Sequence, residues 1–318
     1  MLLSVLGIVL GLAVLTVAAD QFVLGATRIA AHLRVSTVVI GAVVIGFGTS
    51  APELVVSILA GLQGSLDLAV GNIVGSNVAN LSLVLGVAAM IVPISVTWPV
   101  LKREAPLALG IVVLFAVLLQ DGTLDLLDAA LLALALVVAL TTTLVSASRQ
   151  LGDADLQASV EELLEPGARP SIAREWLRTL LGLLGTLAAA QILVVSASDV
   201  ARAIGLSEAF IGLTIVAIGT SLPELATAVQ AARRRETDLL IGNLLGSNIF
   251  NSGAVGAAAA VAGAGQQVDA SVTGLGAGLM VAVAILATVF MVSGRRVQRI
   301  EGVVLLLLYA ITLPFLAG

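Results

Sequence analysis

The chain has 318 residues, of which 59% are apolar and 11% are charged, with 15 Lys and Arg against 20 Asp and Glu. Soluble domains contain about 45–50% apolar and about 25% charged residues. The composition therefore excludes a secreted, disordered or nucleic-acid-binding protein and predicts one embedded in a lipid bilayer. Because there is no cysteine and only one histidine, His32, disulfides, thiolate metal sites and Ser-His triads are excluded as well.

Ten apolar runs approach or exceed the length of about 20 residues that a membrane-spanning helix needs. They are residues 2–25, 37–62, 67–91, 105–119, 125–146, 176–201, 209–232, 239–263, 270–292 and 300–317. The first run lacks a preceding basic region and has a counterpart in mid-chain, so we expect a retained helix rather than a signal peptide. The sequence predicts an all-α polytopic membrane protein with ten transmembrane helices.

Basic residues gather on one side of these ten spans. Fourteen of the fifteen lie in alternate loops, namely Arg28, Arg34, Lys102, Arg103, Arg149, Arg169, Arg174, Arg178, Arg233, Arg234, Arg235, Arg295, Arg296 and Arg299. The opposite side receives only Arg202. By the positive-inside rule the fourteen face the cytoplasm, which places both termini outside. The polar stretch 147–174 is then a cytoplasmic linker, with a short helix expected at Ala158–Leu164.

The two halves of the chain, 1–146 and 175–318, contain related sequences. Residues 36–80 and 207–251 align without gaps and share 18 of 45 positions, including GTSAPEL against GTSLPEL and GNIVGSNVAN against GNLLGSNIFN. The identities are concentrated on Gly, Thr, Ser, Pro, Glu and Asn, which indicates duplication rather than chance apolar similarity. Since each half has five spans, the halves are expected to be inverted repeats, an arrangement typical of secondary transporters with a site at the repeat interface.

Each repeat places one glutamate, Glu53 or Glu224, deep inside a predicted span. A carboxylate at the centre of a membrane costs about 2.5–3.5 kcal/mol on insertion scales and marks a functional site by default. No basic residue lies within the apolar part of any span, so protonation or a bound cation must compensate the charge. Pro52 and Pro223 are expected to free backbone carbonyls near Gly48–Thr49 and Gly219–Thr220.

Hydroxyl and amide groups accompany both glutamates. Within one helical turn lie Thr49, Ser50, Thr220 and Ser221. In the GSNxxN segments, Ser76 and Asn80 share one helix face at i and i+4, as do Ser247 and Asn251. Close helix packing better explains the glycines of both segments, namely Gly71, Gly75, Gly242 and Gly246. Together these oxygens form a hard ligand set that suits Ca²⁺.

These twin motifs resemble the two α-repeats (41–86 and 212–257) of the Ca²⁺/cation antiporter superfamily, specifically prokaryotic sodium/calcium exchangers. The resemblance implies a multi-pass protein of a prokaryotic cell membrane, not an enzyme and without a cofactor, that exchanges Ca²⁺ for Na⁺ as a monomer or weak homo-oligomer. It also implies a core of eight helices, with the first and sixth sliding across it. Carried over by position, Ca²⁺ would be bound by Glu53, Glu224 and the carbonyls of Thr49 and Thr220. Sodium would use the same glutamates with Thr49, Ser50, Ser76, Thr220, Ser221, Ser247 and the carbonyls of Gly46 and Ala217, while Asn80 and Asn251 line the middle.

One position departs from the family pattern, because Asn251 stands where many exchangers carry aspartate. With two carboxylates, one Ca²⁺ or two Na⁺ would neutralise the site, and a third Na⁺ would leave it positive. The sequence leaves the counter-ion open among Na⁺, H⁺ and K⁺. A cation channel fits less well, because the inverted repeat predicts alternating access rather than a continuous pore. An enzyme would need a nucleophile or metal cluster beside the carboxylates, and none accompanies them.

Overall fold

The structure, a computed structural model, describes residues 2–149, 171–205 and 217–316. The helix expected at Ala158–Leu164 and residues 209–216 of the seventh predicted span lie outside these ranges. Among the described residues, seven helices are long and apolar enough to cross a membrane, and an eighth is counted if the bent pair Thr37–Thr49 and Ala51–Leu62 is one span. The prediction of a mostly helical, multi-pass membrane protein is confirmed.

The helices of the first half follow the predicted apolar runs, with several interruptions. They are α1 (Leu2–Leu33), α2 (Thr37–Ile40), the π-helix η1 (Gly41–Gly46), α3 (Phe47–Thr49), α4 (Ala51–Leu62), α5 (Leu66–Ala79), the π-helix η2 (Asn80–Val84), α6 (Leu85–Ile91), α7 (Trp98–Lys102), α8 (Glu104–Leu118), the 3-10 turn η3 (Leu119–Asp121) and α9 (Leu126–Arg149). Helix α1 continues eight residues beyond the predicted end at residue 25.

The second half contains a similar series of helices after the linker. They are α11 (Ile172–Ala203), α13 (Ala217–Thr220), α14 (Leu222–Arg233), α15 (Thr237–Phe250), the π-helix η6 (Asn251–Val255), α16 (Gly256–Ala262), the π-helix η7 (Ser271–Gly276), α17 (Ala277–Ser293) and α18 (Arg299–Leu316). The described residues also contain one short antiparallel pair, β1 (Ile94–Ser95) with β2 (Arg296–Val297), which the all-α prediction did not include.

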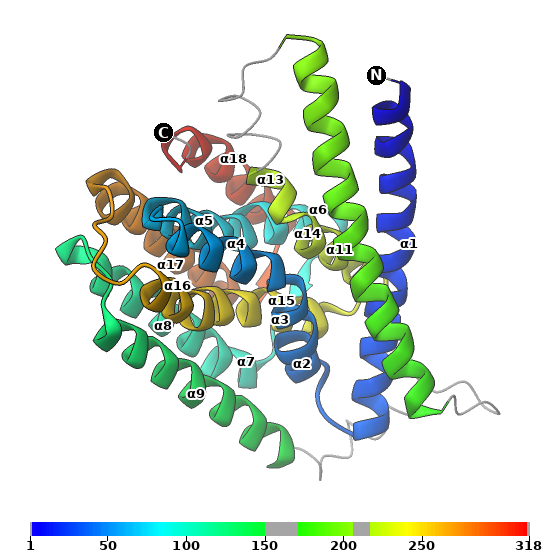
Figure 1. The fold of residues 1–318 in the computed structure, drawn as a ribbon. Helices are drawn as coiled ribbons and strands as arrows, with labels where there is room; N and C mark the ends of the chain where they lie inside the picture. Colours follow the sequence, from blue (N-terminus) through cyan, green and yellow to red (C-terminus); the bar gives the residue numbers. More distant parts are fainter. Residues whose placement is uncertain (1, 150–170, 206–216, 317–318) are drawn as a thin grey trace.

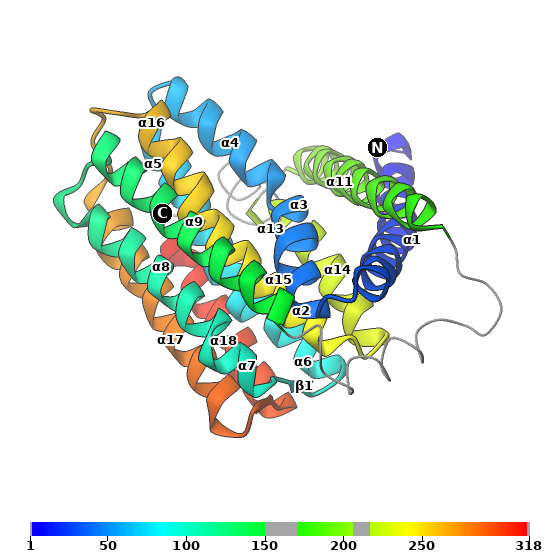
Figure 2. The same ribbon diagram turned by 90° about the horizontal axis from the view of Figure 1, so that it is seen from below.

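Helices α1 and α11 lie side by side and run along one flank of the remaining helices (Figures 1 and 2). Glycine permits their close approach, because a Cβ added at Gly182 would come within 2.6 Å of the Phe22 backbone nitrogen. Much of the outer face of α1 is exposed leucine and valine, for example Leu10 at 62% and Val17 at 63%. In a bilayer such faces contact lipid, while small residues hold the helix pair together.

A buried carboxylate joins α1 to α11 near the start of α11. Glu175 of α11 is fully buried and pairs with Arg28 of α1 at 3.5 Å and with Arg178 at 3.3 Å. Both arginines keep about a quarter of their side-chain surface exposed. One acid thus balances two cations from neighbouring helices.

Replacing Glu175 with Gln is expected to destabilise the protein by about 1–3 kcal/mol, because two partly buried guanidinium groups lose their counter-charge. Thermal unfolding in detergent measures the change. The matched control is Asp199→Asn, which alters a half-exposed pair with Arg202 and should shift the unfolding temperature little, since exposed pairs contribute about 0–1 kcal/mol. An equal shift in both variants would contradict the importance of the buried network.

Helix α15 crosses the α2–η1 segment, and this contact positions the two halves of the chain relative to each other. A Cβ at Gly242 would strike the backbone of Val38, and one at Gly246 would strike the backbone of Ala42. The predicted packing role is therefore confirmed at these two glycines. It is wrong for Gly71 and Gly75, because a Cβ added at either position would meet no neighbouring atom of the described residues within 4 Å. Backbone-to-backbone contact at the crossing brings α15 directly against Gly46, whose own Cβ would lie 2.9 Å from the nitrogen of Ser247.

Candidate functional site

Two helix breaks lie beside the glutamates. Ser50 separates α3 from α4 with a bend of 43°, and Ser221 separates α13 from α14. Pro52 and Pro223 each occupy the first turn of the following helix, where the missing N–H is tolerated. The predicted unwinding is present, but its centre lies one residue beyond Thr49 and Thr220, because the helix restarts just before each proline.

Glu53 in α4 and Glu224 in α14 lie close together in the interior. Each is 1% exposed. The Ser50 hydroxyl, one turn before Glu53, donates a hydrogen bond of 3.1 Å to Glu224 Oε1. No described Lys or Arg forms an ion pair with either glutamate. The two acids therefore form a buried pair of carboxyl groups contributed by separate halves of the chain.

Polar side chains from α5 and α15 support the backbone at each glutamate. Asn72 Nδ2 donates to the Glu53 carbonyl at 3.2 Å and to Ser57 Oγ at 3.0 Å. In the second half, Asn243 Nδ2 donates to Thr227 Oγ1 at 3.2 Å, and that hydroxyl donates to the Glu224 carbonyl at 2.9 Å. These contacts fix each glutamate-bearing turn against the following long helix.

An amide network lies beside the carboxylates where the two GSNxxN segments meet. Asn80 Nδ2 donates to Asn248 Oδ1 at 3.1 Å, and Asn77 Nδ2 donates to Ser252 Oγ at 3.0 Å. Sequence reasoning missed Asn77, Asn248 and Ser252. Asn77 and Asn248 occupy equivalent positions in the two repeats, and this identity could have indicated them. The prediction instead used the spacing of four residues on one helix face, which selected Ser76 and Asn80.

The structure also places the other predicted site residues near these elements. Ser247 Oγ donates to the Gly46 carbonyl at 3.2 Å, which joins residues of the two halves. Thr49 and Ser221 are buried, and the Thr49 hydroxyl donates to the Ile45 carbonyl at 3.0 Å. Ser76 is buried on α5, which packs against α13, the short helix that starts at Ala217. The structure thus collects most predicted positions around the two breaks.

Two of the π-helices, η2 and η6, each face the glutamate-bearing helix of the opposite half. Helix η6 packs against α4, and η2 packs against α14. The π-helices begin at Asn80 and Asn251, and such bulges occur frequently at functional sites. This crosswise packing places Asn251, which is fully buried, next to the helix that carries Glu53.

Several buried oxygens of this region have no hydrogen-bond donor among the described residues. They include Glu53 Oε2, Glu224 Oε2, Asn80 Oδ1 and Asn251 Oδ1. Buried polar atoms are nearly always paired, so a cluster of unpaired ones needs a specific explanation. All four are hard oxygen ligands of the kind that Ca²⁺ prefers. Within the described chain no third Asp, Glu or His joins the glutamates to form a metal-binding group, so carbonyl, hydroxyl and amide oxygens must complete any coordination.

A pocket of about 380 Å³ adjoins the two breaks. Its lining includes Pro52, Thr220 and Pro223 on one side, and Gln191, Ser198 and Arg202 of α11 on the other. Thr220, unlike Thr49, is therefore partly accessible. The pocket therefore adjoins one of the predicted ligand positions, Thr220, near the end of α11 that carries Arg202.

Known proteins match this chain over nearly its whole length. The family model described as sodium/calcium exchanger protein matches residues 3–145 and 175–318. A protein named putative antiporter CaxA, from Alkalimonas amylolytica, is 38% identical over 312 residues, which are 97% of each chain. The sodium/calcium exchanger MaX1 of Methanosarcina acetivorans is 30% identical over an alignment of 341 positions, which covers 95% of each chain.

The fold also matches a solved structure. The sodium-calcium exchanger NCX_Mj, soaked with 2.5 mM Na⁺ and 0.1 mM Ca²⁺, superposes with a TM-score of 0.84 and 31% sequence identity, covering 99% of this chain and 98% of that one. Its helical membrane fold is therefore shared by the present chain. With the family model matched on both sides of the linker and similar relatives aligned almost end to end, the chain belongs to the sodium/calcium exchanger protein family.

Proposed function

We propose that this protein is a secondary antiporter that exchanges Ca²⁺ for Na⁺ across the membrane by alternating access. The observation that carries the proposal is the buried pair Glu53 and Glu224, linked through Ser50, with unpaired oxygens on both carboxylates. A cation is the natural partner for two acids that no described basic side chain neutralises. The family match supports cation antiport, and the oxygen chemistry supports Ca²⁺ and Na⁺ as the cargo.

Competition for one ligand set explains how the two fluxes are coupled. The proposed ligands are Glu53 and Glu224 together with the hydroxyl and carbonyl oxygens of both breaks, the Gly46 and Ala217 carbonyls, Ser76, Ser247, Asn80 and Asn251. Because Ca²⁺ and Na⁺ need the same carboxylates, the two cargoes cannot be fully bound together. One Ca²⁺ or two Na⁺ balances the two negative charges, so each loaded state can be carried across the lipid without a large charge penalty.

We further propose that ten helices cross the membrane as two inverted five-helix repeats, 1–146 and 175–318. The linker 147–174 and the fourteen clustered basic residues then face the cytoplasm, and both termini face outside. In this arrangement α1 and α11 move as a pair across the core, so that the pocket beside Thr220 closes while a symmetry-related one opens. Cysteine accessibility on either side of the membrane tests this topology.

Proteoliposomes loaded with Na⁺ are expected to take up labelled Ca²⁺ when diluted into Na⁺-free buffer, because outward Na⁺ flow drives inward Ca²⁺ exchange. Na⁺ release measured in the same sample should accompany the uptake. The control is an equal Na⁺ concentration on both sides, which removes the driving force. Ca²⁺ uptake that does not depend on the Na⁺ gradient would contradict the proposal. If that uptake followed an imposed pH gradient in Na⁺-free buffer, the counter-ion would be H⁺ instead of Na⁺.

A further inference from the structure

A second pocket lies between α1 and α11, near the start of α11. It has a volume of about 340 Å³ and is lined by Ala18, Gln21, Arg174, Leu177, Arg178, Leu181 and Gly182. The close approach of Gly182 to Phe22 limits its depth, because the two backbones nearly touch there. This pocket shares no lining residue with the pocket beside the breaks.

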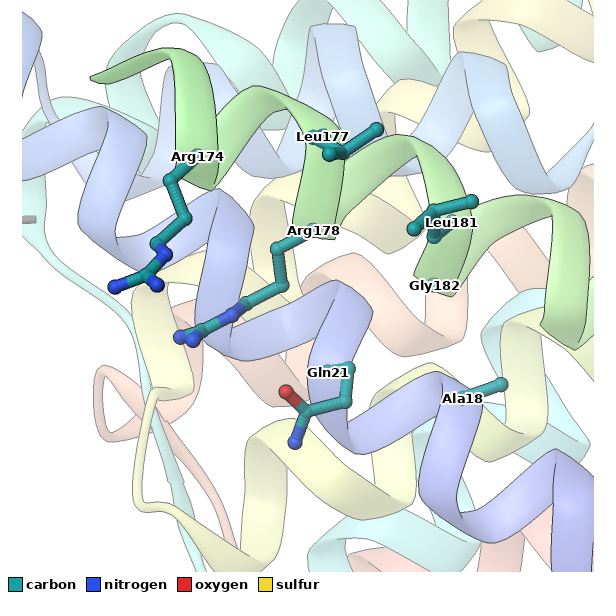
Figure 3. A pocket seen from close by; sticks show the side chains of 7 residues that line it. All are labelled: Ala18, Gln21, Arg174, Leu177, Arg178, Leu181 and Gly182. Atoms are coloured by element: carbon teal, nitrogen blue, oxygen red, sulfur yellow. The ribbon is translucent and has the colours of Figure 1, made fainter. Parts of the chain in front are cut away.

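The lining is divided into a cationic end and an apolar end. Figure 3 shows the guanidinium groups of Arg174 and Arg178 and the amide of Gln21 at one end, with Leu177, Leu181 and Ala18 toward the other. Residues 174 and 182 are separated by about 12 Å along the helix axis. The apolar end therefore extends toward the middle of the bilayer, while the polar end lies at its surface.

Positive charge exceeds negative charge at the polar end. Glu175 is shared between Arg28 and Arg178, and no described acidic residue forms an ion pair with Arg174. Arg178 Nη1 is buried and donates no hydrogen bond to a described group, although it lies 3.3 Å from Glu175. Among the described residues, the three arginines Arg28, Arg174 and Arg178 share one carboxylate, which leaves about two positive charges uncompensated and one buried donor unused.

The depth of the pocket in the membrane is indicated by its neighbours on α11. Trp176 is 44% exposed, whereas Leu177 and Leu181 are 56% and 59% exposed. Tryptophan is enriched at the level of the lipid headgroups, and exposed leucines below it face the acyl chains. Arg174 and Arg178 therefore lie at headgroup level, on the side that carries the other clustered arginines.

We propose that this pocket binds one anionic phospholipid, with the headgroup phosphate between Arg174 and Arg178 and the start of an acyl chain along Leu177 and Leu181. Guanidinium groups match the oxygens of a phosphate well, and basic pockets between transmembrane helices on the cytoplasmic side are suited to anionic headgroups. The divided lining favours a lipid over a free anion, which would use only the polar end. The lipid bridges α1 and α11 at the point where Glu175 joins them.

Native mass spectrometry of the full-length protein, titrated with phosphatidylglycerol or phosphatidylcholine of equal acyl chains, tests this site. The wild type is expected to bind phosphatidylglycerol more tightly. Arg174→Gln should weaken that binding about fivefold, since each basic residue near a lipid surface contributes about 1 kcal/mol, and should leave phosphatidylcholine unchanged. Arg174 is exposed on the first turn of α11, so this variant retains the fold.

Arg299→Gln is the matched control, because Arg299 is an exposed arginine at the start of α18, outside the pocket. It should leave the affinity for phosphatidylglycerol within about twofold of the wild type, well below the contribution of one lipid-contacting arginine. An equal loss in both variants, or no loss in Arg174→Gln, would overturn the proposal. Displacement of the lipid by millimolar inorganic phosphate would also overturn it and identify a free-anion site instead.

Discussion

Replacing either Glu53 or Glu224 with Gln is expected to reduce Na⁺-driven Ca²⁺ uptake by at least about 100-fold. Removing one of the two carboxylate charges would leave part of the bound cation's charge uncompensated in a buried site. The loss of a buried charge partner costs about 3–5 kcal/mol, and every 1.4 kcal/mol is about a tenfold change in affinity. Glutamine keeps the size and one oxygen of the side chain, so the loss reports on charge. Labelled Ca²⁺ uptake into Na⁺-loaded proteoliposomes measures the effect.

Glu104→Gln provides the control for this experiment. Glu104 of α8 is 4% exposed and has an unpaired Oε2, so it resembles the two site glutamates in burial and in lacking a partner. It lies in the first turn of α8, outside both helix breaks. We expect Glu104→Gln to retain Ca²⁺ uptake. Normal uptake in Glu53→Gln or Glu224→Gln, with the protein folded, would contradict the assignment of the site.

The sequence predicted the local features of the site because their causes are local. Proline removes a backbone N–H and disfavours the helix in the turn before it, and a break lies just before both Pro52 and Pro223. A glutamate in an apolar run needs a proton or a cation to compensate its charge. This requirement identifies Glu53 and Glu224 from the sequence alone. The sequence therefore located both helix breaks to within one residue and predicted the burial of both glutamates. The ion-binding site itself remains a proposal, which transport measurements test.

Contacts between the halves could not be predicted in the same way. The hydrogen bond from Ser50 to Glu224 and the one from Ser247 to Gly46 join residues more than 170 positions apart, and they depend on how α15 crosses η1. The repeat indicated that equivalent residues matter, but not which ones meet. Asn248 illustrates this limit. The i and i+4 spacing from Ser247 selected Asn251, but Asn248 is the residue that accepts a hydrogen bond from Asn80.

The π-helices and the Glu175 network were also beyond sequence reasoning. The π-helical turns at Asn80 and Asn251 lie inside longer apolar helices, and the apolar residues around them do not mark where one turn widens. Arg28 and Glu175 are 147 positions apart, and their pairing follows only from the antiparallel packing of α1 and α11. The charge distribution placed Arg28 and Arg178 on one side of the membrane but gave no partner for either.

Replacing Gly246 with Ala is expected to destabilise the protein by about 1–3 kcal/mol or more and to impair transport, because the added methyl group overpacks the crossing of α15 and η1. A Cβ there strikes the Cα and carbonyl oxygen of Ala42, and backbone atoms cannot rotate away as a flexible side chain can. Separation of the two segments would also pull Ser247 from the Gly46 carbonyl. Thermal unfolding in detergent and Ca²⁺ uptake measure the two effects.

Gly110→Ala in α8 separates this steric cause from the ordinary effect of glycine in a helix. A Cβ at Gly110 meets no described atom within 4 Å, so alanine there should be neutral or should stabilise the helix by up to about 1 kcal/mol. The same substitution is thus expected to act in opposite directions at two helical positions. If Gly246→Ala were as stable and active as Gly110→Ala, the backbone contact between α15 and η1 could not be what aligns the two halves of the site, and Ser50 with Glu224 would have to hold the halves in register instead.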